Sequence, residues 1–255
     1  MAERARPAVY TIPPHRAFAD ALVAGLRRRA GDDPLALARA TILLPNNRAA
    51  RAVTEAFVRA SGGGLLLPRL IALGDPEAGE AIGAAFDPAD AEPIPPAVDP
   101  FRRRMALARL VQEERASAGQ PVDAAEAVRL AGELARTLDQ LLIEEVAPQR
   151  LREIELGELR RHWETALRTF SVVLDRWPAE LRALGCIDAA ERRNRLLDRV
   201  TARWRAEPPA GLVCAAGVTD AAPAVARLLR AVAALPRWPG RRRPPPRRAR
   251  AIPRP

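Results

Sequence analysis

The first sixty residues alternate short apolar runs with stretches in which apolar residues recur at helical spacing. Ala8–Ile12 is apolar and rich in β-branched and aromatic residues, which predicts a strand that two prolines end. A helix is predicted from Ala17, because apolar residues recur every three or four positions. Thr41–Pro45 predicts a second strand, followed by a second helix with Asn46 or Asn47 as its N-cap. Two strands that alternate with two helices predict a parallel sheet of the α/β class.

From residue 101 the pattern changes to long amphipathic helices. Two are predicted over 101–115 and 122–146. A third carries aromatic and aliphatic residues at helical spacing until Pro178, which should kink or stop it. A fourth begins at Asp188 with a capping-box-like sequence. Gly211–Gly217 returns to strand character, and Pro223 opens a last helix.

These shifts predict a discontinuous α/β domain that contains an all-helical insertion. The expected parts are the first section of the α/β domain at 1–75, a linker at 76–100, the helical insertion at 101–207, the return to the α/β domain at 208–235, and a disordered Arg/Pro-rich tail at 236–255.

Charge is concentrated at one end of the chain. The 255 residues include 41 basic and 31 acidic residues, giving a net charge of +10, and every basic residue is an arginine. The last twenty residues hold eight arginines and no acid, so the rest of the chain is close to neutral. The absence of lysine excludes Schiff-base chemistry, lysine general bases and the lysine of phosphate-binding loops.

The sequence offers no catalytic, cofactor-binding or metal-binding constellation. Between the first strand and helix, Pro13–Ala17 lacks the glycines, lysine and Ser/Thr of a phosphate-binding loop. Cys186 and Cys214 are too few for a thiolate metal site, and His15 and His162 lie far apart in sequence. No apolar run reaches transmembrane length, so we expect a cytoplasmic protein that does not engage the membrane.

The second strand–helix connection is the best candidate site. Asn46, Asn47 and Arg48 follow the carboxyl end of a predicted parallel strand and begin a helix, the edge at which open α/β sheets bind ligands. Amide side chains, free helical N–H groups and an arginine suit a nucleic-acid phosphate. The alternative is that an asparagine caps the helix and Arg48 is only solvated.

The Arg/Pro tail also has two interpretations. It could be a nucleic-acid-binding arm, which would make the protein a small basic adaptor for RNA or DNA. Nearly all of its residues have GC-rich codons, however, and the alanine-rich, lysine-free body already implies a GC-rich gene. An out-of-frame product of such a gene would have this composition, and we favour that interpretation.

Five segments in their order along the chain resemble the N-terminal part of the alphaproteobacterial AddB family. They are VYTIPPHRAFADALVAGL, ATILLPNNRAARAVTEAF, PPAVDPFRRRMALARLV, AEAVRLAGELARTLDQLLIEE and GLVCAAGVTDAAPAVARLLR. The similarity covers about residues 7–237. AddB-type chains are subunits of the AddA–AddB helicase–nuclease, which processes DNA double-strand breaks for recombinational repair.

The resemblance implies a helicase-like α/β domain of superfamily 1 ancestry with a degenerate ATP loop and an inserted helical subdomain. Asn47 and Arg48 match a segment with which such helicases touch single-stranded DNA. The family's nuclease residues and iron–sulfur cluster would lie beyond this chain, so neither ATP nor a cluster is expected here. The expected role is that of a non-catalytic N-terminal fragment, shortened by a frameshift, that positions DNA and docks an AddA-like subunit.

Overall fold

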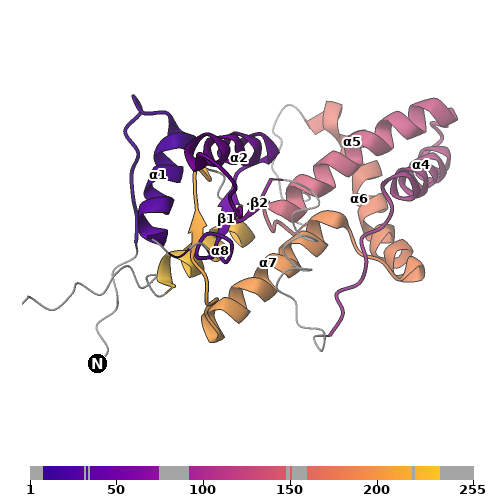
Figure 1. Cartoon of the computed structure of the whole chain (residues 1–255). Helices are drawn as coiled ribbons and strands as arrows, with labels where there is room; N and C mark the ends of the chain where they lie inside the picture. The colour runs from indigo at the N-terminus through magenta and orange to yellow at the C-terminus, as the bar shows by residue number, and fades with distance from the viewer. Residues whose placement is uncertain are drawn as a thin grey trace, which may run out of the picture. The chain divides into compact units, whose positions relative to one another are not determined.

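The computed structural model describes residues 8–74 except 32 and 34, then 92–147, 150, 160–219 and 222–235; within this part, the side chains of 160–169 and 172 are not described. The chain divides into two compact units (Figure 1). Unit 1 contains the chain up to Gly74, Arg203–Thr219 and the chain from Leu229. Unit 2 contains Asp75–Ala202 and Asp220–Leu228. The predicted tail at 236–255 lies outside the described residues, as does most of the predicted linker.

Unit 1 is built on a parallel sheet of three short strands, β1 (Thr41–Leu44), β2 (Arg69–Ala72) and β3 (Val213–Ala215). The spatial order is β2-β1-β3, and both pairs are parallel. Ile42 lies opposite Leu70 on one side and Cys214 on the other. The prediction of a parallel α/β sheet is confirmed at this level.

Helices α1 (Phe18–Ala30) and α2 (Asn47–Ser61) form one apolar core with the sheet. Alternate residues of β1 contribute to this core, because successive side chains of a strand point to opposite faces. Each fully buried large side chain contributes about 1.5–3 kcal/mol relative to an exposed one. The buried members of the core are Val23, Leu26, Leu37, Ile42, Leu44, Val53, Ala56, Phe57 and Ala216.

Two glycines let backbone segments approach closely at the ends of the strands. A Cβ at Gly211 would lie 1.9 Å from the carbonyl oxygen of Arg39, just before β1. At the opposite edge, a Cβ at Gly74 would lie 2.6 Å from the carbonyl oxygen of Pro45. The Gly74 N–H donates to that same oxygen at 2.9 Å. Any side chain at either position would push β1 away from its neighbour.

The predicted segment Ala8–Ile12 is not a strand, so that prediction is wrong. It runs as an extended trace outside the sheet (Figure 1), with Val9 and Tyr10 largely exposed. Its β-branched and aromatic residues favour a strand, but a strand needs a neighbour at hydrogen-bonding distance. A cavity of about 770 Å³ separates this segment from β3, the edge strand with which it shares the cavity lining.

Unit 2 is helical, and its helices match the predicted ones closely. They are α4 (Pro100–Ser117), α5 (Ala124–Ile143), α6 (Arg160–Leu184), and most of α7 (Ala189–Ala206); α8 (Pro223–Ala234) divides between the units. Asp99 and Asp123 cap α4 and α5 by accepting from backbone N–H groups at 2.8 Å. Ahead of α4, Ala97 forms a parallel bridge with Ile187.

The third predicted helix passes through Pro178 and continues to Leu184, so of the two expected outcomes, a kink or a stop, the stop is wrong. Proline removes one helical hydrogen bond and costs about 3 kcal/mol in a helix interior. The residues on either side offset this cost, because Trp177 and Leu181 are both buried in the core that α4, α5 and α6 share.

A buried ion-pair network ties these helices to the start of α7. The guanidinium of Arg103 contacts Asp188 at 2.8 Å and Asp139 at 2.9 Å. Asp188, only 3% exposed, also accepts from the indole N–H of Trp177 at 2.9 Å. Burial raises the pKa of the Asp188 carboxyl, while Arg103 and Trp177 oppose that rise.

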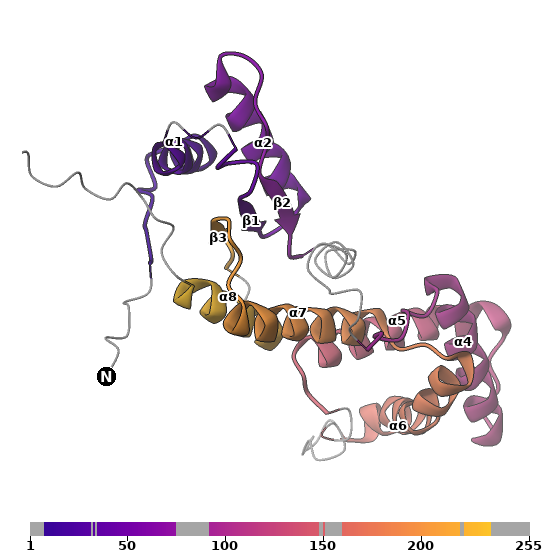
Figure 2. The same ribbon diagram turned by 60° about the horizontal axis from the view of Figure 1, so that its bottom comes forward.

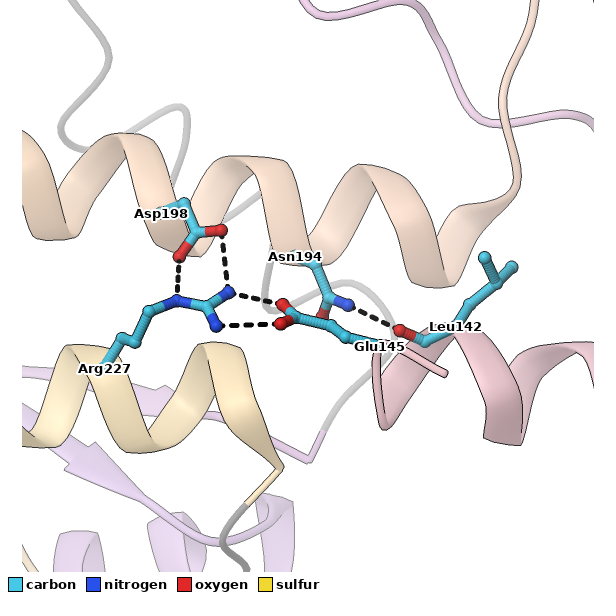
Figure 3. A network of polar contacts seen from close by, with 5 residues as sticks. All are labelled: Leu142, Glu145, Asn194, Asp198 and Arg227. Carbon is cyan, nitrogen blue, oxygen red and sulfur yellow. Dashed lines mark hydrogen bonds and ion pairs between the residues drawn. The ribbon is translucent and has the colours of Figure 1, made fainter. Parts of the chain in front are cut away.

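A second network, at the end of α5, joins α5, α7 and α8 (Figure 3). Arg227 donates to Asp198 at 2.7 and 2.8 Å and to Glu145 at 2.8 Å. Asn194 donates to the carbonyl of Leu142 at 2.7 Å. These bonds satisfy backbone and charged groups that the end of a helix would otherwise leave to water.

Candidate functional site

The connection between Ala8–Ile12 and α1 has few free backbone N–H groups. Pro13 and Pro14 have no backbone N–H, and the N–H of Arg16 is turned back onto the carbonyl of Pro13 at 3.0 Å. The N-cap position, Ala17, makes no side-chain cap, and an acid, Asp20, stands in the first turn of α1. This acid offsets the partial positive charge of the helix N-terminus and also pairs with Arg59 of α2 at 2.7 Å.

The connection between β1 and α2 leads into a helix end that is capped and has no acid in its first turn. Asn46 is the N-cap of α2, and its side chain accepts from the N–H of Ala49 at 2.9 Å. Capping therefore belongs to Asn46, which settles the choice between Asn46 and Asn47. Asn47 and Arg48 form the first turn of the helix, and both are exposed at the carboxyl end of β1.

The electrostatics of this helix end favour an anion. The first turn of α2 contains no acid, so the partial positive charge of the helix N-terminus is not neutralised there. Arg48 is exposed, and it forms no ion pair with any residue that the structure describes. Arg51, which sequence reasoning missed, lies three positions further on and is also exposed. The i,i+3 spacing places both guanidinium groups on neighbouring positions of one helix face.

Glycines follow the two strands that neighbour β1, and both pack closely against other residues. The backbone at Gly74, after β2, is held against Pro45, after β1. After β3, Gly217 has a φ of 67°, and a Cβ there would lie 3.3 Å from the ring of Phe18. At the carboxyl ends of the strands, the first turn of α2 follows β1 (Figure 2), and a glycine lies two residues after β2 and after β3.

The remaining candidate residues are not brought together. His15 is exposed, and the side chain of His162 lies outside the described residues. Cys214 is half-buried in β3, and burial raises the pKa of its thiol, which disfavours the nucleophilic thiolate. Across the described ranges, no three His, Cys, Asp or Glu side chains gather as metal ligands would. No described helix has the length and apolar character of a membrane span.

Comparisons with known proteins identify no relative of this chain. No protein-family model matches the sequence, and neither do any curated protein or solved structure.

Proposed function

We propose that this chain is a non-catalytic component of an AddB-type helicase–nuclease and holds single-stranded DNA at the start of α2. The observation that carries the proposal is the exposed first turn of α2, where Asn47 and Arg48 follow a parallel strand and the turn itself contains no acid. A phosphate there would meet the helix N-terminus and two arginines, Arg48 and Arg51. The resemblance of five segments to AddB is the reason for proposing DNA as the nucleic acid. It is also the reason for proposing an AddA-like subunit in the cytoplasm as the partner.

The connection that precedes α1 supports a role without ATP hydrolysis. Superfamily 1 ancestry would place the ATP loop between Ala8–Ile12 and α1. Two prolines, an acid in the first turn and the absence of lysine leave that position without the groups that bind and polarise a triphosphate. Such a chain would contribute DNA contacts and a scaffold, and ATP turnover would belong to its partner.

The test is single-stranded DNA binding by the R48A variant as a function of salt. Losing one phosphate contact should weaken binding equally for all sequences and lower the slope of log affinity against log salt by about 0.7. R104A is the matched control, because Arg104 is also exposed but lies on α4 in unit 2. Fluorescence anisotropy with oligonucleotides of two unrelated sequences gives both quantities.

The arginine-rich tail requires a second arm of the experiment. Each variant is measured in the full chain and in a chain that ends at Leu235, which removes eight arginines. The proposal predicts that the shorter chain retains binding and remains sensitive to R48A but not to R104A. Loss of all binding with the tail, and equal behaviour of the two variants, would instead make the protein a basic adaptor that binds through its tail.

A further inference from the structure

The chain leaves β2 through two successive hydrogen bonds to the end of β1. The Leu73 N–H donates to Leu44 O at 2.8 Å. The next N–H, that of Gly74, donates to Pro45 O at 2.9 Å. In a regular parallel ladder, successive N–H groups of a strand point to opposite sides, so only every second one reaches the same neighbour. The backbone therefore turns toward the end of β1 at Gly74, beside the residue that precedes the N-cap of α2.

A side chain does not fit at this turn. A Cβ at Gly74 would lie 2.6 Å from the carbonyl oxygen of Pro45, a distance at which one of the two groups must move. The obstacle is a backbone atom and not the end of a flexible side chain, so the main chain itself would have to shift. Gly74 is exposed, whereas Leu73 is buried, so an added methyl group would not enter the core of unit 1.

A shift of the Pro45 carbonyl is transmitted to the start of α2. This carbonyl belongs to the peptide group that joins Pro45 to Asn46, and the proline ring fixes φ of Pro45 at about −65°. The peptide group therefore moves mainly by rotation about ψ of Pro45, which turns the backbone of Asn46 as well. The Asn46 side chain accepts from the Ala49 N–H at 2.9 Å and caps the helix. Arg48 lies between these two residues, in the first turn.

We propose that Gly74 is a positioning residue for the DNA contact at α2, an inference that rests on the proposed function. Because Gly74 has no side chain, the end of β2 can hold the Pro45 carbonyl by a hydrogen bond. This contact fixes the direction in which the first turn of α2 presents Arg48. Gly74 does not itself touch the nucleic acid. A fixed turn favours binding, because less conformational freedom is lost when the phosphate is bound.

The test compares G74A with G64A in the full chain. Gly64 precedes β2, and a Cβ there would have no heavy atom within 4 Å, so the same substitution meets open space. The affinity of G74A for single-stranded DNA should fall by up to the factor measured for R48A. Its slope of log affinity against log salt should fall by up to about 0.7. G64A should bind as the wild type does.

A double-mutant cycle separates positioning from a general loss of stability. If Gly74 acts through Arg48, G74A should cause no further loss of affinity in the R48A chain. A general effect on folding would instead lower the affinity by the same factor in both chains.

Amide hydrogen exchange measured by NMR gives a readout that does not depend on DNA. G74A should speed exchange at Ala49 about fivefold, as expected for a weakened N-cap. Exchange at Val53, which is buried one turn further along α2, should stay unchanged.

Three results would each overturn the inference: wild-type affinity and salt slope in G74A, an equal further loss of affinity in the R48A chain, or unchanged exchange at Ala49. If the wild type binds no single-stranded DNA, the proposed function fails by itself, and exchange at Ala49 still decides whether Gly74 positions this turn. If G74A does not fold, exchange in the wild type decides. There the Gly74 N–H should be protected although the residue is exposed, and the oligonucleotide should slow its exchange further. Fast exchange at Gly74, or no response to the oligonucleotide, would refute the positioning role.

Discussion

Replacing Glu145 by glycine should leave the protein at least as stable as the wild type, whereas alanine should destabilise it. Glu145 follows the C-cap of α5 with a φ of 54°, in the left-handed region. Its N–H donates to Leu142 O at 3.1 Å, and the Val146 N–H donates to Leu141 O at 2.8 Å. These two bonds define a Schellman motif, in which this position is usually glycine.

The expected magnitudes follow from the geometry and the exposure. A left-handed conformation costs a non-glycine residue about 1–2 kcal/mol. The ion pair with Arg227 offsets little of this, because both side chains are about a third exposed and such pairs contribute about 0–1 kcal/mol. Arg227 also keeps Asp198 as a partner in either variant. E145G therefore loses the pair but relieves the strain, whereas E145A only loses the pair, and E145G should be more stable by about 1 kcal/mol.

Urea unfolding followed by circular dichroism measures the difference directly. The control pair is E144G and E144A, at the preceding C-cap residue, whose φ of −82° suits any side chain. There the order should reverse, with alanine more stable than glycine by about 0.5–1 kcal/mol. If E145A proved as stable as E145G, the left-handed backbone at Glu145 would not carry the cost assigned to it, and the reasoning would fail.

Two further predictions concern ion pairs in unit 2. D188A should destabilise the protein by about 3 kcal/mol, because it leaves the buried Trp177 N–H without its acceptor and Arg103 with one carboxylate. D198A removes a partner from a more exposed ion pair, so in the same urea titration it should cost less than about 1 kcal/mol. Hydrogen bonding from Arg227 lowers the pKa of Glu145, so its stabilisation is present above the ordinary glutamate pKa and lost as pH falls. The stability gap between wild type and E145Q should therefore shrink between about pH 6 and pH 3, and a constant gap would contradict this.

Local patterns predicted most of the helices and two of the three strand positions. Apolar spacing placed α4, α5 and α8 within a few residues of their observed ends. The failures occur where the outcome depends on distant neighbours. Ala8–Ile12 has the composition of a strand but no edge within reach, and α6 passes through Pro178 because the buried residues around that proline hold the helix. Neither condition is visible in a window of neighbouring residues.

The polar networks were beyond sequence reasoning for a related reason. Arg103 and Asp188 are 85 positions apart, and Arg227 and Glu145 are 82 apart, so no helical spacing links them. The position of Asn47 and Arg48 was easier to predict, because it depends only on where one strand ends and one helix begins. The sequence left open which asparagine caps the helix, since either side chain could reach an amide in the first turn.

The two segments that lead into α1 and α2 in unit 1 differ in the electrostatics of the helix ends that follow them. Both place a helix N-terminus after an extended segment, and the backbone alone would make each an anion site. At α1, Asp20 lies in the first turn, where its carboxylate offsets the partial positive charge of the helix N-terminus. Asp20 also forms an ion pair with Arg59 of α2 at 2.7 Å. At α2, the first turn lacks an acid and Arg48 faces solvent. The proposed DNA contact would need only such an exposed helix end, whereas a triphosphate site needs an enclosing loop of N–H donors and a lysine. The side chains of these two turns therefore differ in how far they offset the partial positive charge at the helix N-terminus.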